Sequence, residues 1–250
     1  MDKLKISLPI AQKPWNNKAK KLESACRKAL YDFDMLKGHD KIAIALSGGK
    51  DSLSLLFLLS EIRGRGFKNF ELYAIHITGE FSCGAGISVP LLAAICNRLN
   101  VPFIVKEQKK REKLECYSCS RDRRTLLFEA AKEKDVHCIA FGHHRDDVAQ
   151  TVLMNLFHKA EFEGMHPNIQ MQKYGVRIIR PLYYIDEDDI KSFAAQYGFA
   201  RISCQCPVGQ NSMRKKTQAL LKDIEILYPN ARLNLAYAAD KQGSKKSLTP

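Results

Sequence analysis

Two glycines and a lysine stand where an apolar run meets a helical pattern. Between the apolar runs Ile42–Leu46 and Leu53–Leu59 lies the sequence Ser47-Gly48-Gly49-Lys50-Asp51-Ser52. A loop that leaves a strand and opens a helix directs unpaired backbone N–H groups and the positive end of the helix at one point, so it binds anions. Glycine lets the backbone approach a ligand closely, and Lys50 and Ser52 add an ammonium and a hydroxyl. The natural ligand of such a loop is the phosphate chain of a nucleotide.

The spacing of this loop excludes one common kind of phosphate site. A Walker A loop needs four residues between its first glycine and its Gly-Lys pair, whereas Gly48 and Gly49 are adjacent. The sequence instead resembles the SGGxDS pyrophosphate-binding loop of the PP-loop ATP pyrophosphatases, which cleave ATP between its α- and β-phosphates to activate an acceptor oxygen. A glycine turn that only joins a strand to a helix is the alternative.

A second glycine-led segment, Gly142-His143-His144-Arg145-Asp146-Asp147, also separates a β-prone run from a helical one. Asp146 or Asp147 can cap the helix, because carboxylates are stabilised at the positive end of a helix. Near a bound nucleotide, two carboxylates can also hold Mg²⁺ or take a proton from an acceptor base. For His143 and His144, packing and contact with the nucleotide both remain open.

Cys116 and Cys119 form a CxxC pair, which brings two thiolates within reach of one metal ion or cluster through a tight turn. The basic segment Ser120–Arg124, expected to start a helix, favours thiolate over thiol. A second pair, Cys204 and Cys206, lies far along the chain. Four cysteines would make a structural zinc site, whereas three would leave a cluster with one iron open to sulfide. Three other cysteines are expected to be small core residues: Cys26, Cys96 and Cys138.

Short β-prone runs alternate with helical patterns along most of the chain. This alternation predicts an α/β fold, with a parallel twisted sheet, helices on both faces, and helical additions at the N- and C-terminal ends. Ligands of such folds bind beyond the carboxyl ends of the strands, which puts the Ser47 loop, His76 and the Gly142 segment on one rim. The expected strands are Lys41–Leu46, Glu71–Ile77, Pro102–Glu107, His137–Phe141 and Val176–Leu182, and the expected helices are Lys18–Leu36, Leu53–Ile62, Val89–Leu99, Arg121–Lys132, Val148–Phe157, Asp186–Tyr197 and Met213–Leu227.

The same pattern divides the chain into four parts. Residues 1–40 are expected to form a basic helical segment, and residues 41–185 the ATP-binding domain. Residues 186–239 form a C-terminal helical segment, and residues 240–250 a flexible basic tail.

The composition points to a globular protein with a polyanionic partner. The 250 residues are 45% hydrophobic, carry a formal charge of +13 and have a sequence pI of about 9.4. No apolar run approaches the length of a membrane span, and the start of the chain, Met1–Lys5, lacks the features of a secretory signal, so we expect a cytoplasmic protein that does not bind membranes. A solvated basic face is the alternative to a nucleic-acid partner. The basic clusters are Lys18-Ala19-Lys20-Lys21, Lys109-Lys110-Arg111, Arg121, Arg123-Arg124 and Arg214-Lys215-Lys216.

Together with the turn Arg180-Pro181-Leu182, these motifs resemble the tRNA 2-thiocytidine synthetase family of PP-loop enzymes, in order from about Lys18 to Tyr228. The resemblance implies ATP, Mg²⁺, a 4Fe-4S cluster, tRNA as substrate, and a homodimer. It implies adenylation of the C2 oxygen of an anticodon-loop cytidine and its replacement by sulfur. A cysteine desulfurase or inorganic sulfide would donate the sulfur. Related 2-thiouridine synthetases share the loop, the CxxC pair and a third cysteine, so they remain an alternative, as does a zinc-stabilised RNA-binding protein without catalysis.

The resemblance also implies a role for individual residues. The cluster ligands are Cys116, Cys119 and Cys206, with Cys204 as a reserve. The residues expected to act in catalysis are Lys50, Asp51, Arg123, Asp146 and Asp147. The residues expected to bind the nucleotide are Ser47, Gly48, Gly49, Lys50, Asp51, Ser52, His76, Gly142 and His143.

Overall fold

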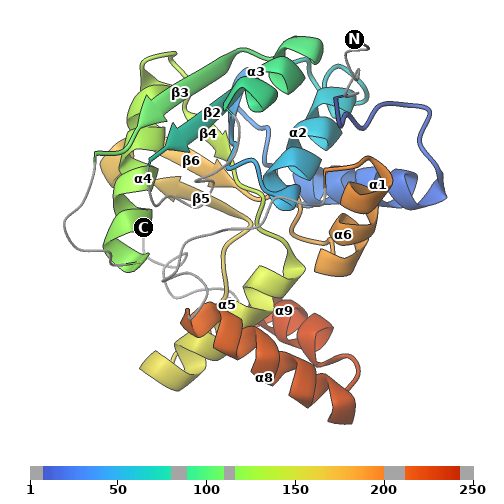
Figure 1. The fold of residues 1–250 in the computed structure, drawn as a ribbon. Helices are drawn as coiled ribbons and strands as arrows, with labels where there is room; N and C mark the ends of the chain where they lie inside the picture. Colours follow the sequence, from blue (N-terminus) through green and yellow to red (C-terminus); the bar gives the residue numbers. More distant parts are fainter. Residues whose placement is uncertain (1–7, 80–88, 110–115, 200–211, 243–250) are drawn as a thin grey trace, which may run out of the picture.

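Six strands form one sheet in the part of the chain that the computed structural model describes, which is residues 8–79, 89–109, 116–199 and 212–242. Their order is β3-β2-β1-β4-β6-β5, and all neighbours are parallel except β5 and β6 (Figure 1). The strands are β1 (Lys41–Ala45), β2 (Glu71–Thr78), β3 (Phe103–Glu107), β4 (Cys138–Ala140), β5 (Asn168–Met171) and β6 (Val176–Ile179).

The predicted parallel sheet is present, and the edge strand β5, which was not predicted, adds one antiparallel pair to it. Residues Asn168–Met171 alternate polar and apolar side chains over only four positions, so no apolar run marks the strand. A turn that ends at Gly175, with a φ of +63°, brings β5 back antiparallel to β6.

The order in which successive strands join the sheet reverses at β1. It passes from β1 to β2 and β3 on one side, and then returns to β4 on the other side of β1. In open α/β sheets, ligands bind at such a reversal, beyond the carboxyl ends of the strands. The loop Ser47–Ser52 follows β1 and the segment 141–144 follows β4, so both leave the sheet at the same edge, as predicted.

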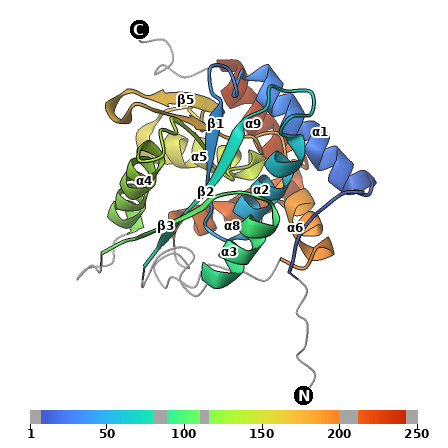
Figure 2. The same cartoon turned by 90° about the horizontal axis from the view of Figure 1, so that it is seen from above.

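Alternate residues of the strands face two different cores, which helices cover from both sides (Figure 2). In β1, Ile42 and Ile44 pack into one core while Ala43 packs into the other. The first core includes residues of α1 (Asn17–Asp32), α2 (Lys50–Ile62), α3 (Val89–Arg98) and α6 (Glu187–Gln196), and the second includes residues of α4 (Cys116–Lys132).

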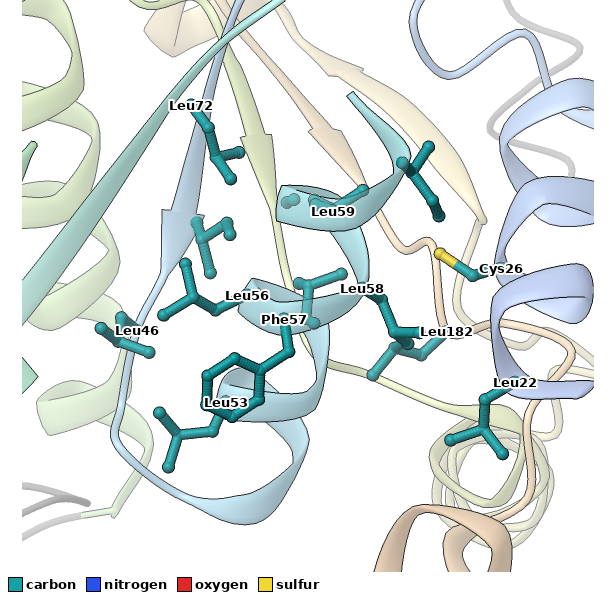
Figure 3. Packing of buried hydrophobic residues seen from close by; sticks show 14 of the residues in the cluster. Leu22, Cys26, Leu46, Leu53, Leu56, Phe57, Leu58, Leu59, Leu72 and Leu182 are labelled. Atoms are coloured by element: carbon teal, nitrogen blue, oxygen red, sulfur yellow. The ribbon is translucent and has the colours of Figure 1, made fainter. Parts of the chain in front are cut away.

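Helix α2 is buried on almost every side because it lies between the sheet and α1 (Figure 3). Its residues Leu55, Leu56, Phe57, Leu58 and Leu59 are each 0% exposed. A helix that is apolar all round belongs in such a position. The helix that begins at the Ser47–Ser52 loop is therefore fixed in place by the main core.

Three further helices pack together beside the main domain (Figure 1). They are α5 (Arg145–Lys159), α8 (Met213–Leu227) and α9 (Ala231–Gln242). Helix α9 was not predicted, and it ends three residues inside the expected tail that starts at Asp240. Alanine-rich contacts explain the omission, since Ala236 and Ala239 pack on α5 and the loop before β5 without a strong apolar stripe.

Three described helices start three or more residues before their apolar patterns. Helix α4 begins at Cys116, five residues before the expected start, and α2 and α5 each begin three residues early, at Lys50 and Arg145. Their first turns consist mainly of polar residues, so the hydrophobic period is absent there. No helix in the described ranges is long and apolar enough to span a membrane.

Candidate active site at the ends of strands β1 and β4

Serine hydroxyls shape the Ser47–Ser52 loop. Gly48 has a φ of +82°, a left-handed conformation that favours glycine. Its N–H donates to Ser52 Oγ at 3.1 Å, and the Ser52 hydroxyl donates to the Gly49 carbonyl at 3.0 Å. The Gly49 N–H donates to Ser47 Oγ at 3.3 Å. These bonds fold the loop onto the first turn of α2, whose N–H groups attract anions.

Gly142 brings the loop after β4 into contact with this turn. A Cβ atom at Gly142 would lie 3.0 Å from both the carbonyl carbon of Asp51 and the nitrogen of Ser52. Such distances are tighter than those of nearly all Cβ atoms, so a side chain at position 142 would require a small shift of the backbone of Asp51 and Ser52. The residue predicted to bind the nucleotide therefore has a second role, which is to let the two loops pack directly.

Lys50 lies between two carboxylates. Its Nζ is 2.8 Å from Asp51 Oδ1 and 3.1 Å from Glu187 Oε1. Burial lowers the pKa of Lys50, but the two carboxylates outweigh burial and the net pKa is raised. The ammonium therefore stays charged beside the loop.

His144 faces three carboxylates. Its Nδ1 lies 3.3 Å from Asp146 Oδ2, and its Nε2 lies 3.4 Å from Asp147 Oδ2 and 3.8 Å from Asp51 Oδ1. Burial alone would lower the pKa of this imidazole, yet the nearby carboxylates raise it. The nearby carboxylates therefore favour the protonated form of His144.

Asp146 and Asp147 also hold cations from the C-terminal helices. Asp147 Oδ1 lies 2.8 Å from Arg214 Nη1 on α8, and Asp146 Oδ1 forms an ion pair with Arg232 on α9. Burial raises the pKa of each carboxyl, but His144 and the arginines more than offset it and lower both pKa values. The two aspartates thus fasten α8 and α9 to the start of α5, while the catalytic role predicted for them remains a prediction.

His143 is held as a neutral ring. Arg180 Nε donates to His143 Nδ1 at 3.3 Å, and the ring stacks on Phe141 with centroids 5.5 Å apart. Burial and the nearby Arg180 lower the pKa of His143 to about 3 although Asp147 opposes them. Because Nδ1 accepts from an arginine, Nε2 carries the ring proton and can donate to a ligand.

Two predicted site residues bind backbone carbonyls at this edge. His76 is 1% exposed, and its Nδ1 lies 2.8 Å from the carbonyl oxygen of Leu46, the residue before the loop. Arg123 Nη2 donates to the carbonyl of Ile77 at 3.3 Å. Both side chains fix the ends of strands β1 and β2, while their predicted contacts with nucleotide or substrate remain predictions.

The CxxC pair lies on the first turn of α4, rather than on a tight turn before a helix. Cys119 Sγ is 3.7 Å from Gln108 Oε1, and Gln108 Nε2 donates to the Cys119 carbonyl at 3.3 Å. Among the described residues, no three His, Cys, Asp or Glu side chains are arranged to hold a metal ion. Cys204 and the predicted third ligand Cys206 lie outside the described residues.

The core cysteines behave as predicted. Cys26, Cys96 and Cys138 are each 0% exposed, and burial raises the pKa of each thiol to about 12. A buried thiol of such high pKa is a poor metal ligand.

Comparison with known proteins agrees with this geometry. A protein-family profile described as a PP-loop domain matches residues 3–203. A "tRNA-cytidine(32) 2-sulfurtransferase" from Paraburkholderia phytofirmans is 35% identical over 231 residues, which cover 88% of this chain and 68% of that protein. The chain belongs to the PP-loop tRNA-cytidine 2-sulfurtransferase family. A member of that family from Legionella pneumophila (strain Corby) is 33% identical over 229 residues, covering 88% and 80% of the two chains.

A solved structure shares the fold of this family member. It is that of the "U34-tRNA thiolase NcsA from Methanococcus maripaludis with its [4Fe-4S] cluster", with a TM-score of 0.73 and 25% identity. The match covers 90% of this chain and 78% of the other. The predicted PP-loop fold and family are thereby confirmed.

Glu187 and Arg232 lie in the site of this sulfurtransferase family member, although the sequence did not predict them there. Glu187 follows the turn Arg180-Pro181-Leu182 and looks in the sequence like one of several acidic residues that start a helix. Arg232 lies on α9, a helix that the sequence pattern did not predict, so nothing in the sequence marked it as a site residue. Arg214, predicted to contact tRNA, pairs with Asp147 instead of being left to solvent.

Proposed function

We propose that this chain thiolates tRNA by adenylating the C2 oxygen of an anticodon-loop cytidine and replacing that oxygen with sulfur. The relatives reported above are named "tRNA-cytidine(32) 2-sulfurtransferase", which describes the transfer of sulfur to a tRNA cytidine. The observation that carries the proposal is the contact between the Ser47–Ser52 loop and Gly142, because it joins a phosphate-binding turn to a second loop rich in His and Asp.

ATP is the energy source in this proposal. The N–H groups at the start of α2 and the Lys50 ammonium would bind the pyrophosphate end of ATP and stabilise the charge that develops there. The C2 oxygen of cytosine is a poor leaving group, so it first attacks the α-phosphorus and expels pyrophosphate. The adenylated base then loses AMP, a good leaving group, when sulfur attacks C2.

Around the reacting base, we assign roles to the neighbouring side chains. Asp51, the most exposed of the three site carboxylates, would hold Mg²⁺ with Asp146 and Asp147 nearby. His143 would donate its Nε2–H to the nucleotide, and Arg123 would bind the substrate from the middle of α4.

The CxxC pair fits a thiolate-held cluster. Cys116 and Cys119 are three residues apart on the first turn of α4, a spacing at which two cysteines can bind one metal ion or cluster. Cys206 would be the third ligand. When bound, a 4Fe-4S cluster with three cysteine ligands would supply an iron at which external sulfide can be held.

The proposal also includes a sulfur donor, a second copy of the chain and contacts with the tRNA backbone. A cysteine desulfurase or inorganic sulfide would donate the sulfur, and two copies of the chain would form a homodimer. Lysines and arginines of α1, α4 and α8 would contact the tRNA phosphates in the cytoplasm. Size-exclusion chromatography with light scattering tests the dimer.

The experiment that tests the reaction is an assay of the anaerobically reconstituted protein with tRNA, ATP and sulfide, followed by nucleoside analysis. Formation of 2-thiocytidine, with AMP and pyrophosphate in equal amounts, supports the proposal. Formation of 2-thiouridine alone would move the chain to the uridine branch. A colourless protein that holds one zinc ion and cleaves no ATP would instead indicate a zinc-stabilised RNA-binding protein without catalysis.

A further inference from the structure

Glu187 joins the phosphate-binding loop to the C-terminal helices. It is the first residue of α6, and its side chain is 14% exposed. Its two carboxylate oxygens have different partners. Oε1 lies 3.1 Å from Lys50 Nζ, whereas Oε2 accepts from Gln218 Nε2 on α8 at 3.0 Å and lies 3.1 Å from Lys191 Nζ.

The backbone of the same residue is also fixed. The Glu187 N–H donates to Asp146 Oδ2 at 2.8 Å, so the aspartate that pairs with Arg232 also caps the start of α6. Since Glu187 is held at its backbone and at Oε2, its Oε1 can hold Lys50 in one place. Burial and the nearby Lys50 and Lys191 have opposite effects on the pKa of Glu187, and the net pKa is lowered, which keeps the carboxylate charged.

We propose that Glu187 is a positioning residue of the reaction, which holds the Lys50 ammonium beside the Ser47–Ser52 loop and links it to α8. This inference rests on the proposed ATP-dependent function, since it assigns Lys50 to pyrophosphate. A lysine side chain has a flexible four-carbon stem, so an unheld ammonium samples many rotamers. With Asp51 on one side and Glu187 on the other, the Lys50 ammonium is held in one place at the start of α2 before the nucleotide arrives.

The two carboxylates have a further electrostatic consequence. They repel the phosphates of bound ATP as well as attracting Lys50, so they do not strengthen ground-state binding. Their benefit comes from a preorganised ammonium at the place where charge develops on the leaving pyrophosphate. Loss of Glu187 should therefore lower kcat and leave the KM for ATP unchanged or lower.

The variant Glu187→Gln tests this, because it keeps the size and Oε1 but removes the charge. Pyrophosphate release is measured with saturating tRNA while ATP is varied. We expect kcat to fall about 10- to 100-fold, with the KM for ATP within about twofold of wild type or below it. Asp188→Asn is the matched control, because Asp188 is a neighbouring carboxylate that is 85% exposed and pairs only with Lys191 among the described ion pairs. The control should stay within about twofold of wild type in both constants.

A second variant keeps the inference testable if Glu187→Gln fails to fold. Gln218→Leu removes the α8 partner of Oε2 and leaves the charge of Glu187 in place. It should lower kcat in the same direction but by less, about two- to fivefold, with an unchanged melting temperature. A rise in KM alone, or wild-type constants in both variants, would overturn the role of Glu187. A wild-type protein that releases no pyrophosphate would instead overturn the proposed function.

Discussion

A Cβ atom added to Gly142 would lie 3.0 Å from the backbone nitrogen of Ser52. Two loops that are 90 residues apart in the sequence are therefore in van der Waals contact at the carboxyl ends of β1 and β4. Any side chain at position 142 must push the first turn of α2 away. The shape of the anion-binding turn thus depends on a residue outside it.

Gly142→Ala should weaken ATP binding and destabilise the fold together. Overpacking of this kind costs about 1–3 kcal/mol, and the displaced turn should raise the Kd for a non-hydrolysable ATP analogue about tenfold or more. Calorimetric titration and urea unfolding measure the two effects. Gly164→Ala is the control for overpacking, because its Cβ would meet the side chains of Val148, Ala239 and Val152 at 3.1–3.3 Å instead of the backbone of the loop. Equal analogue affinity in wild type and Gly142→Ala would contradict the role of this contact.

The ion pair between Asp146 and Arg232 should be a main anchor of α9. Its side chains are only 2% and 16% exposed, so loss of one partner leaves the other charge buried. We expect Arg232→Met to lower the free energy of unfolding by about 3–5 kcal/mol. The exposed pair of Lys41 and Asp135 is the control, and Lys41→Met should cost under about 1 kcal/mol. Similar losses of unfolding free energy in the two variants would show that the buried pair stabilises the fold no more than the exposed pair does.

The cluster around His144 predicts how stability depends on pH. The pKa values of Asp146 and Asp147 are lowered, so their contribution is present above their unfolded pKa of about 4 and is lost as the pH falls through the folded values. The pKa of His144 is raised, so its contribution is full below about 6.5 and is lost as the pH rises through the folded value. The cluster should therefore stabilise the protein most between about pH 4 and 6.5.

Urea unfolding at several pH values checks this dependence. The variant His144→Gln should remove the decrease in stability on the alkaline side and leave that on the acid side smaller but present. His137→Gln is the control, because His137 is half exposed and pairs with a surface aspartate. An alkaline decrease that persists in His144→Gln would contradict the assignment.

The sequence was sufficient for the fold wherever the hydrophobic pattern was strong. Strand β1 appears within one residue of its predicted bounds, and helix α2, apolar on all sides, ends at the predicted residue Ile62. Strand β5 and helix α9 were missed because Asn168–Met171 is a short half-polar edge, and because Ala231–Gln242 packs through small alanines. In both cases tertiary contacts, which local patterns do not contain, decide the structure.

The site was predictable by residue type but not by partner. The loop, Gly142 and the aspartates follow from glycine and carboxylate chemistry at strand ends. Their pairing with Arg214, Arg232 and Glu187 does not, because those residues lie on helices 67, 86 and 137 residues away from their partners in the chain. The sequence shows that a residue is charged, but it does not show which distant residue will form an ion pair with it.

Cys119→Ser should abolish the cluster that we propose at the start of α4, because a serine hydroxyl is a poor ligand for iron compared with a thiolate. Protein reconstituted anaerobically with iron and sulfide should lose its brown colour and its bound iron and sulfide, while its melting temperature without cluster stays at the wild-type value. Cys138→Ala is the matched control, since Cys138 is a buried thiol whose pKa is raised to about 12, and its cluster content should equal that of wild type. Full iron and sulfide in Cys119→Ser, or their loss in Cys138→Ala alone, would remove the CxxC pair from the ligand set, and a stoichiometric zinc in the wild-type protein would replace the cluster with a structural site.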